Sequence, residues 1–173
     1  MCGFVYFHQT KLAKEQFDRA LESIHHRGPD DTESGEMMGN LFGFKRLAIM
    51  DPTHKGDQPF KSSSAMVMCN GEIYNYQALK LEFSSYAYTS KSDCEVLLPL
   101  YEKGGIELVT SRIDGEYAFV ILDKKSGELF AARDPMGIRP LFYGKTKTGE
   151  VAFASEAKAL KETCTDIVPF PPG

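Results

Sequence analysis

The sequence lacks several features that would place it outside the cytoplasm or at a metal. No apolar run approaches the roughly 20 residues that cross a membrane, and no Cys-x-x-Cys pair suggests zinc or redox chemistry. The N-terminus has neither the basic start nor the long apolar stretch of a signal peptide. We therefore expect a cytoplasmic protein with reduced thiols, no membrane partner and no metal.

An excess of positive charge is also missing. Lysine and arginine number 20 against 24 acidic residues, a formal charge of −4, whereas a nucleic-acid partner would favour a basic patch. Apolar residues make up 42% and charged residues 25%, which is ordinary for a soluble domain. Residues 1–173 are enough for one domain with its own core. Among the cysteines, Cys69 and Cys94 lie in apolar stretches and are expected to be buried as small hydrophobes.

Helical and strand patterns are mixed in the first part of the chain. Phe17, Ala20, Leu21 and Ile24 recur at helical spacing, and RGPD stops that helix because a residue before proline disfavours helix. NGEIYN is interpreted as a glycine-containing turn after a buried strand. The patterns predict strands over residues 3–7, 41–49 and 66–69, and helices over residues 11–26, 76–83 and 93–103.

The second part of the chain is dominated by hairpins. Strand patterns over residues 116–123 and 128–133 flank a KSGE turn, and residues 141–144 and 151–155 make a second pair. A short helix is expected over residues 156–161. Because strands and helices do not alternate strictly, the pattern favours an α+β layered fold over a parallel doubly wound sheet.

The chain ends in VPFPPG, which has three prolines in six residues and opposes both helix and central strand. We interpret residues 167–173 as the start of a linker to a further domain.

Cys2 has unusual chemistry if Met1 is removed. The mature residue would carry a thiol and a free α-amine, whose ordinary pKa of about 7.7–8.0 leaves a useful neutral fraction at physiological pH. That amine can accept the thiol proton, which provides a nucleophile and a base without a histidine. If Met1 stays attached, the amine is blocked and the protein is expected to be inactive. Position alone is weak support, because many chains begin Met-Cys by chance.

Nine short motifs in a fixed order strengthen this interpretation. Together they resemble the glutamine-hydrolysing domain of class II, N-terminal-nucleophile amidotransferases, and the forms NGEIYN and RDPxGIRPL look most like asparagine synthetase. The resemblance covers essentially the whole chain. In chain order the motifs are MCG at the start, RGPD (27–30), RLAIMD (46–51), QPF (58–60), CNGEIYNY (69–76), SDCEVL (92–97), DGEYAFV (114–120), RDPMGIRPLFYG (133–144) and FASEAKAL (153–160).

The resemblance implies a four-layer αββα sandwich and a catalytic group at Cys2, Asn70 and Gly71. Cys2 would attack the side-chain amide of L-glutamine, and a glutamyl thioester would form before water releases glutamate. The Asn70 side chain and the Gly71 backbone N–H would stabilise the oxyanion. The plainer alternative is that Asn-Gly marks only a turn.

The resemblance also implies residues that bind the two charged groups on the α-carbon of the substrate. Arg46 would bind the α-carboxylate, since a guanidinium forks onto a carboxylate with two hydrogen bonds. Glu72 and Asp93 would bind the α-ammonium group. The alternatives are a surface arginine at a strand end and, for Asp93, a helix cap.

Three further positions follow from the resemblance. The backbone near Leu47 and Ile49 would hold substrate, and Arg27 would shape the site near the nucleophile. His25 and His26 precede Arg27, but the family needs no Cys–His dyad, so we expect them at a helix C-terminus, where the dipole favours them.

Partners follow from the same resemblance. Full-length relatives carry a synthetase domain that binds ATP and Mg and makes an aspartyl-AMP acceptor for the ammonia, so no cofactor is expected within this chain. Two alternatives stay open: the same glutaminase serving another acceptor, and a non-catalytic regulatory module. An intact set of Cys2, Arg46, Asn70, Gly71 and Asp93 argues against the second. The sequence also leaves open a homodimer.

Overall fold

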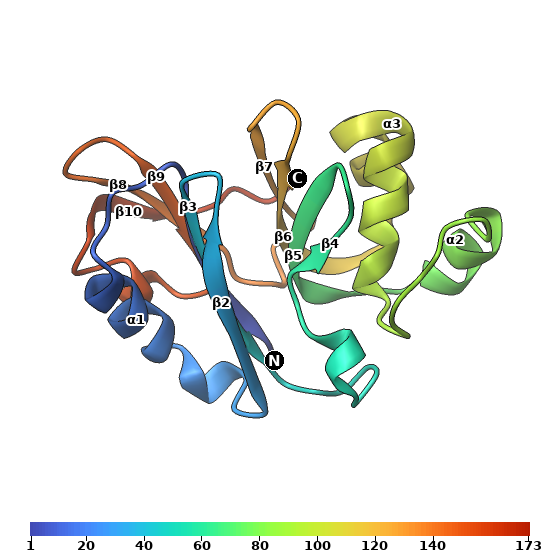
Figure 1. The fold of residues 1–173 in the computed structure, drawn as a ribbon, viewed down its shortest axis with the longest axis horizontal. Coiled ribbons are helices and arrows are strands. Elements are labelled where there is room, and N and C mark those ends of the chain that lie inside the picture. The colour runs from blue at the N-terminus through green and yellow to red at the C-terminus, as the bar shows by residue number, and fades with distance from the viewer.

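The computed structural model describes residues 1–173 as two stacked antiparallel sheets with helices on both outer faces (Figure 1). The helices are α1 (Lys14–Glu22), α2 (Tyr76–Glu82) and α3 (Leu97–Arg112), with short 3-10 turns η1 (His25–Arg27), η2 (His54–Gly56), η3 (Cys94–Val96) and η4 (Ala157–Ala159). The strands are β1 (Gly3–Phe7), β2 (Asp31–Met37), β3 (Asn40–Arg46), β4 (Phe60–Lys61), β5 (Ala65–Ile73), β6 (Gly115–Asp123), β7 (Leu129–Arg133), β8 (Phe142–Thr146), β9 (Val151–Ala154) and β10 (Cys164–Pro169).

The first sheet has six strands in the order β10-β8-β9-β1-β3-β2. Its central strand β1 is entirely buried, and successive side chains of a strand point to opposite faces. Val5 and Phe7 therefore pack under α1, while Phe4 and Tyr6 face the second sheet. The side chains of the five-residue run GFVYF thus pack into two separate cores.

The second sheet has four strands in the order β4-β5-β6-β7. Its long strands β5 and β6 pair from Ala65 opposite Asp123 to Ile73 opposite Gly115. Met66 and Met68 face the first sheet, whereas Val67 faces α3. Strand β4 pairs with only two residues of β5, so the rest of that edge of β5 has no partner strand.

Three buried clusters separate four layers, with α1 over the first sheet and α2 and α3 over the second (Figure 1). One cluster of 11 residues lies under α1, another of 11 lies between the sheets, and one of 16 lies under α2 and α3. The expectation of an α+β fold with an αββα sandwich is confirmed. No helix is long and apolar enough to cross a membrane.

Most expected elements are present, including both hairpins, but the turn expected over NGEIYN is confined to its last two residues, Tyr74 and Asn75. Asn70 and Gly71 lie within β5, which continues to Ile73. A Cβ atom on Gly71 would lie 2.5 Å from the carbonyl oxygen of Glu116 on β6. Glycine is therefore required here by the close approach of two strands rather than by a turn.

Other boundaries differ for local reasons. The helix expected over residues 11–26 is only α1 followed by η1, and the helix expected to end at residue 103 continues to Arg112 across a kink at Gly104 and Gly105. Strand β2 was not expected, and the short helix near residue 156 is the 3-10 turn η4. In the proline-rich tail, Val168 and Pro169 pair with β8 at the edge of the sheet, where proline is tolerated.

Candidate active site

A cavity of about 130 Å³ lies where the start of β1, the end of β3 and the unpaired edge of β5 meet. This is smaller than the roughly 300–1,000 Å³ of pockets for drug-sized ligands, so it suits a small molecule. Eight of the nine candidate site residues line the cavity, and the ninth, Arg27, lies behind Cys2. The lining consists of Met1, Cys2, Arg46, Leu47, Ile49, Met50, Gly56, Gln58, Cys69, Asn70, Gly71, Glu72, Ser92, Asp93, Cys94 and Arg139.

The thiol of Cys2 is held at the cavity by the backbone of Leu47. The Leu47 N–H donates to Sγ at 3.3 Å, and Sγ donates to the Leu47 carbonyl at 3.5 Å. Burial raises the pKa of the Cys2 thiol, although the Leu47 hydrogen bond and the N-terminal charge oppose the rise. The thiol therefore needs a base to become a nucleophile at neutral pH. Neither His25 nor His26 contacts it: His26 pairs with Glu156 instead.

The backbone of Cys2 is held by Arg27 and Asn70. Arg27 donates from Nε to the Cys2 carbonyl at 2.8 Å. The Asn70 amide satisfies its neighbours when Nδ2 donates to the same carbonyl at 3.0 Å and Oδ1 accepts from Arg27 Nη2 at 3.3 Å. Because an amide nitrogen carries two hydrogens, Asn70 keeps one further N–H for a ligand. Gly3 makes room for Arg27, since a Cβ there would lie 2.8 Å from Arg27 Cδ.

Gly71 presents its backbone at the unpaired edge of β5. In an antiparallel strand, the N–H and C=O of alternate residues point to the same side. Cys69 bonds to the Gln58 side chain through both groups, and the Ile73 N–H donates to Asp93, so that side faces away from β6. Gly71 lies between these two residues, and its N–H therefore points to the same side, where it lines the cavity.

Arg46 is buried and is held by the loop that follows β3. Its Nη1 donates to the carbonyl of Thr53 at 2.9 Å and to Asp57 at 2.5 Å, and its Nη2 donates to the carbonyls of Met50 and Asp51. All four terminal N–H groups thus have acceptors in the ligand-free protein. A carboxylate ligand at Arg46 must replace some of these acceptors.

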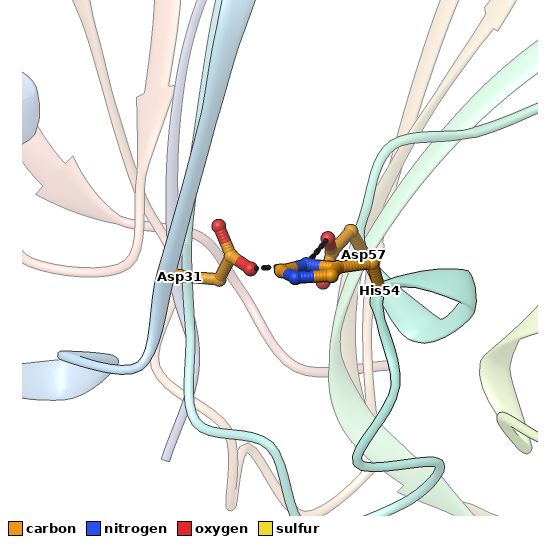
Figure 2. A group of neighbouring side chains, drawn as sticks. All are labelled: Asp31, His54 and Asp57. Atoms are coloured by element: carbon orange, nitrogen blue, oxygen red, sulfur yellow. Dashed lines mark hydrogen bonds and ion pairs between the residues drawn. The ribbon is translucent and has the colours of Figure 1, made fainter.

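Asp57 also belongs to a second contact, shown in Figure 2. His54 and Asp57 come from the loop, and Asp31 faces them from the start of β2. His54 Nδ1 lies 2.8 Å from Asp31 and 3.0 Å from Asp57, and the hydrogen bond to Asp57 and the charge of Asp31 raise the pKa of His54. The three side chains have metal-ligand chemistry, but the guanidinium of Arg46 at Asp57 opposes a cation. We interpret them as an ion-pair bridge that joins the loop to β2.

The two acidic candidates occupy different surroundings. Glu72 is exposed at the cavity mouth, on the face of β5 that carries Asn70. Asp93 is buried, and its Oδ2 accepts from the Ile73 N–H at 2.7 Å. Asp93 occupies the N-cap position of η3, as the helix-cap alternative expects, but its side chain makes no cap hydrogen bond there. Ile49 is 73% exposed, which places its side chain at the rim of the cavity.

Sequence reasoning missed some of the residues at the site. Gln58 mimics a strand neighbour for β5, as its amide both donates to and accepts from the backbone of Cys69. The sequence shows Gln58 in the QPF motif, but nothing in the motif predicts that its side chain pairs with the backbone of β5. Arg139 lies in the RDPMGIRPLFYG motif, from which we predicted no site residue, yet it contacts Met1 and lines the cavity. Met1 itself lines the cavity, so its removal would free the Cys2 amine and also enlarge the space.

The family described as the glutamine amidotransferase domain matches residues 1–168.

The chain belongs to this glutamine amidotransferase family.

Its relatives in the family include asparagine synthetases. A probable glutamine-hydrolysing asparagine synthetase of Acanthamoeba polyphaga mimivirus is 44% identical over 92% of this chain. Glutamine-hydrolysing asparagine synthetase 2 of Oryza sativa is 44% identical over the whole chain. In both cases the chain spans only 30% of the relative's length.

A solved amidotransferase shares the fold. The glutamine phosphoribosylpyrophosphate amidotransferase of B. subtilis superposes with a TM-score of 0.83 at 24% identity, over 99% of this chain and 46% of that one. The expected family and the N-terminal-nucleophile type of fold are therefore confirmed, whereas the roles of the individual site residues stay predictions.

Proposed function

We propose that this chain is a glutaminase domain that hydrolyses L-glutamine to L-glutamate and ammonia through a thioester on Cys2. The observation that carries the proposal is the meeting of a thiol, two oxyanion donors and an arginine in one small cavity. Family membership supports the substrate class. A non-catalytic module would not need these groups to converge.

Cys2 provides both the nucleophile and, once Met1 is removed, the base. The α-amine takes the thiol proton, and Sγ attacks the amide carbon of the glutamine side chain. Negative charge develops on the amide oxygen, where the free N–H of Asn70 and the N–H of Gly71 stabilise it. Ammonia leaves with the proton returned by the amine, and water then hydrolyses the thioester. Because burial raises the thiol pKa, this proton transfer is essential.

The remaining groups fix the amino-acid end of glutamine. Arg46 binds the α-carboxylate after releasing part of the loop, and Glu72 and Asp93 bind the α-ammonium group. The backbone around Leu47 and the side chain of Ile49 close the cavity over the substrate. Opposite charges on the two sides of the amino-acid end fix its orientation, so that the side-chain amide points toward Cys2.

The domain would supply ammonia within a larger asparagine-synthetase-like protein of the cytoplasm. The support is 44% identity to asparagine synthetases of which this chain spans 30%. The linker expected over residues 167–173 would start only after β10, which ends at Pro169, and would lead into the synthetase domain, which would bind ATP and Mg and form the aspartyl-AMP acceptor. All four cysteines are free in the structure, which agrees with a reducing compartment.

Intact-mass measurement with an electrophilic glutamine analogue tests the site directly. We expect a starting mass without methionine and, after incubation, a single adduct on Cys2 that excess glutamine prevents. Cys2→Ala should give no adduct and no glutamate release, while Cys164→Ala, which is outside the cavity, should behave as wild type. A processed Cys2 that does not react would refute the proposal for this chain.

A further inference from the structure

The carboxylate of Glu156 lies directly behind the catalytic cysteine, although it does not line the cavity. Its Oε1 accepts from Arg27 Nη1 at 3.1 Å, and Arg27 in turn donates to the Cys2 carbonyl. Glu156 precedes η4 and is 129 residues from Arg27 in sequence. The chain of contacts therefore runs from Glu156 through Arg27 to the backbone of Cys2.

The burial of Arg27 makes this contact necessary. The Arg27 side chain is only 9% exposed, and a buried charge is costly unless it is paired and hydrogen-bonded. Glu156 is the only carboxylate that pairs with it. The other groups that Arg27 contacts, the Cys2 carbonyl and the Asn70 amide, carry no charge. Glu156 thus keeps the guanidinium in the orientation that satisfies both.

The backbone next to Glu156 is also tied to the strand that carries Cys2. The Phe4 N–H donates to Ser155 Oγ at 3.0 Å, and the Ser155 N–H donates to the Phe4 carbonyl at 3.0 Å. Ser155 is fully buried. Cys2 lies two residues before Phe4 and Glu156 directly follows Ser155, so the Phe4–Ser155 contact holds both residues close together. Arg27 then bridges them.

We infer that Glu156 is a positioning residue for Cys2. It acts through Arg27, which fixes the nucleophile and Asn70 relative to each other. The inference rests on the proposed function, because it assigns the task of the pair to that reaction. Site residues need supporting contacts that hold their geometry, and at metal sites the loss of such a contact typically costs about 10–100-fold in metal affinity or activity.

Other charged groups face Glu156 and enter its electrostatics. His26 Nε2 lies 2.9 Å from Oε1, and Lys158 Nζ lies 3.0 Å from Oε2. Burial opposes ionisation of Glu156, but the hydrogen bonds from Lys158, Arg27 and His26 bring its pKa below the ordinary value. The carboxylate is therefore charged at neutral pH and compensates positive charge close to Cys2.

The test compares Glu156→Gln, Glu156→Asp and a matched control. Glu162→Gln removes a carboxylate from an exposed pair with Arg19 at 3.2 Å in the same part of the molecule and leaves the cavity untouched. For each protein we would measure kcat and KM for glutamine hydrolysis across pH, the melting temperature, and the rate at which iodoacetamide alkylates Cys2.

Glu156→Gln should lower kcat about tenfold, within the roughly 10–100-fold typical of supporting residues, and should leave KM within about twofold. Its uncompensated positive charge favours the thiolate and the neutral amine, so the acidic limb of kcat and of alkylation should move to lower pH by about half a unit. Glu156→Asp should restore the position of the limb but only part of kcat, as the shorter side chain keeps the charge and loses the geometry.

Two results would overturn the inference. One is an unchanged acidic limb of Cys2 alkylation in Glu156→Gln. The other is a loss of kcat that the lower melting temperature fully explains and that Glu162→Gln shares. If wild-type protein that has lost Met1 hydrolyses no glutamine, the proposed function fails, and the alkylation profiles alone decide whether Glu156 controls Cys2.

Discussion

Replacement of Asn70 by aspartate separates the chemistry of this residue from its packing. Asn70 is 1% exposed, and its amide both donates to the Cys2 carbonyl at 3.0 Å and accepts from Arg27 at 3.3 Å. An ionised aspartate has the same shape but only accepts hydrogen bonds. It would therefore keep the contact with Arg27 and lose both the bond to Cys2 and the N–H proposed for the oxyanion.

The expected loss of rate follows from the oxyanion donor. Removal of one such donor costs about 10²–10³ in kcat in a serine protease, which passes through a similar tetrahedral intermediate. The additional carboxylate also repels the developing negative charge, so Asn70→Asp should lie at the upper end of that range. KM should change little, because Asn70 is not among the groups proposed to bind the α-carboxylate and the α-ammonium of the substrate.

The melting temperatures of the two Asn70 variants should not follow the order of their catalytic rates. Asn70→Ala leaves a hydrogen of Arg27 Nη2 without a partner and removes one of the two donors to the Cys2 carbonyl, at a cost of about 1–3 kcal/mol. For a domain of this size, each kcal/mol lowers the melting temperature by about 2–4 °C. In Asn70→Asp the new ion pair with Arg27 offsets part of that cost, so its melting temperature should lie between those of Asn70→Ala and wild type.

Steady-state glutamate release and thermal unfolding of the three proteins provide the assay. The reasoning requires Asn70→Asp to be the more stable variant and yet at least as impaired as Asn70→Ala. An aspartate variant that retains more than a tenth of the wild-type kcat would refute the oxyanion role of Asn70. Equal melting temperatures for the two variants would refute the proposed contact with Arg27.

Two further perturbations test the surroundings of the site. Gly71→Ala should destabilise the protein by about 1–3 kcal/mol in urea unfolding, because the new Cβ would lie 2.5 Å from the Glu116 carbonyl, and a normal midpoint would contradict the close strand approach. The raised pKa of His54 means that its bridge between Asp31 and Asp57 is complete below the unfolded pKa and is lost as pH rises through the folded pKa. Hydrogen exchange of residues 50–57, corrected for intrinsic rates, should therefore accelerate with rising pH, and His54→Gln should remove this pH dependence.

The sequence predicted the elements whose pattern is local. The hairpin of β6 and β7 follows from two apolar strand segments on either side of a KSGE turn, and β1 from a five-residue apolar run. Strand β2 has no such pattern, because DTESGEM lies at the edge of its sheet with most of its side chains exposed. It is a strand only because residues 31–37 pair in register with β3. A partner in space, rather than the segment itself, determines its structure.

The sequence predicted only those site residues whose motif or side chain suggests a chemical role. Cys2, Arg46 and Asp93 each carry a side chain whose chemistry suggests a role, and the structure places all three at one cavity. What Arg46 binds in the ligand-free protein was not predictable, because its acceptors are mostly backbone carbonyls of a loop. Glu156 was part of a recognised motif, but its partner Arg27 is 129 residues away. Long-range ion pairs leave no trace in local spacing.

The layered fold explains why the proposed nucleophile and the proposed oxyanion donors depend on each other. Cys2 precedes the first strand of one sheet, whereas Asn70 and Gly71 belong to the other sheet. The distance between them is therefore set by the packed core between the sheets, which resists small changes because protein interiors are close-packed. At the edge of that core, the Cys2 carbonyl accepts hydrogen bonds from Arg27 and Asn70, so one acceptor joins the two sheets at the site of reaction. The sandwich thus holds the two halves of the site in register, and the polar contacts around Arg27 supply the final alignment.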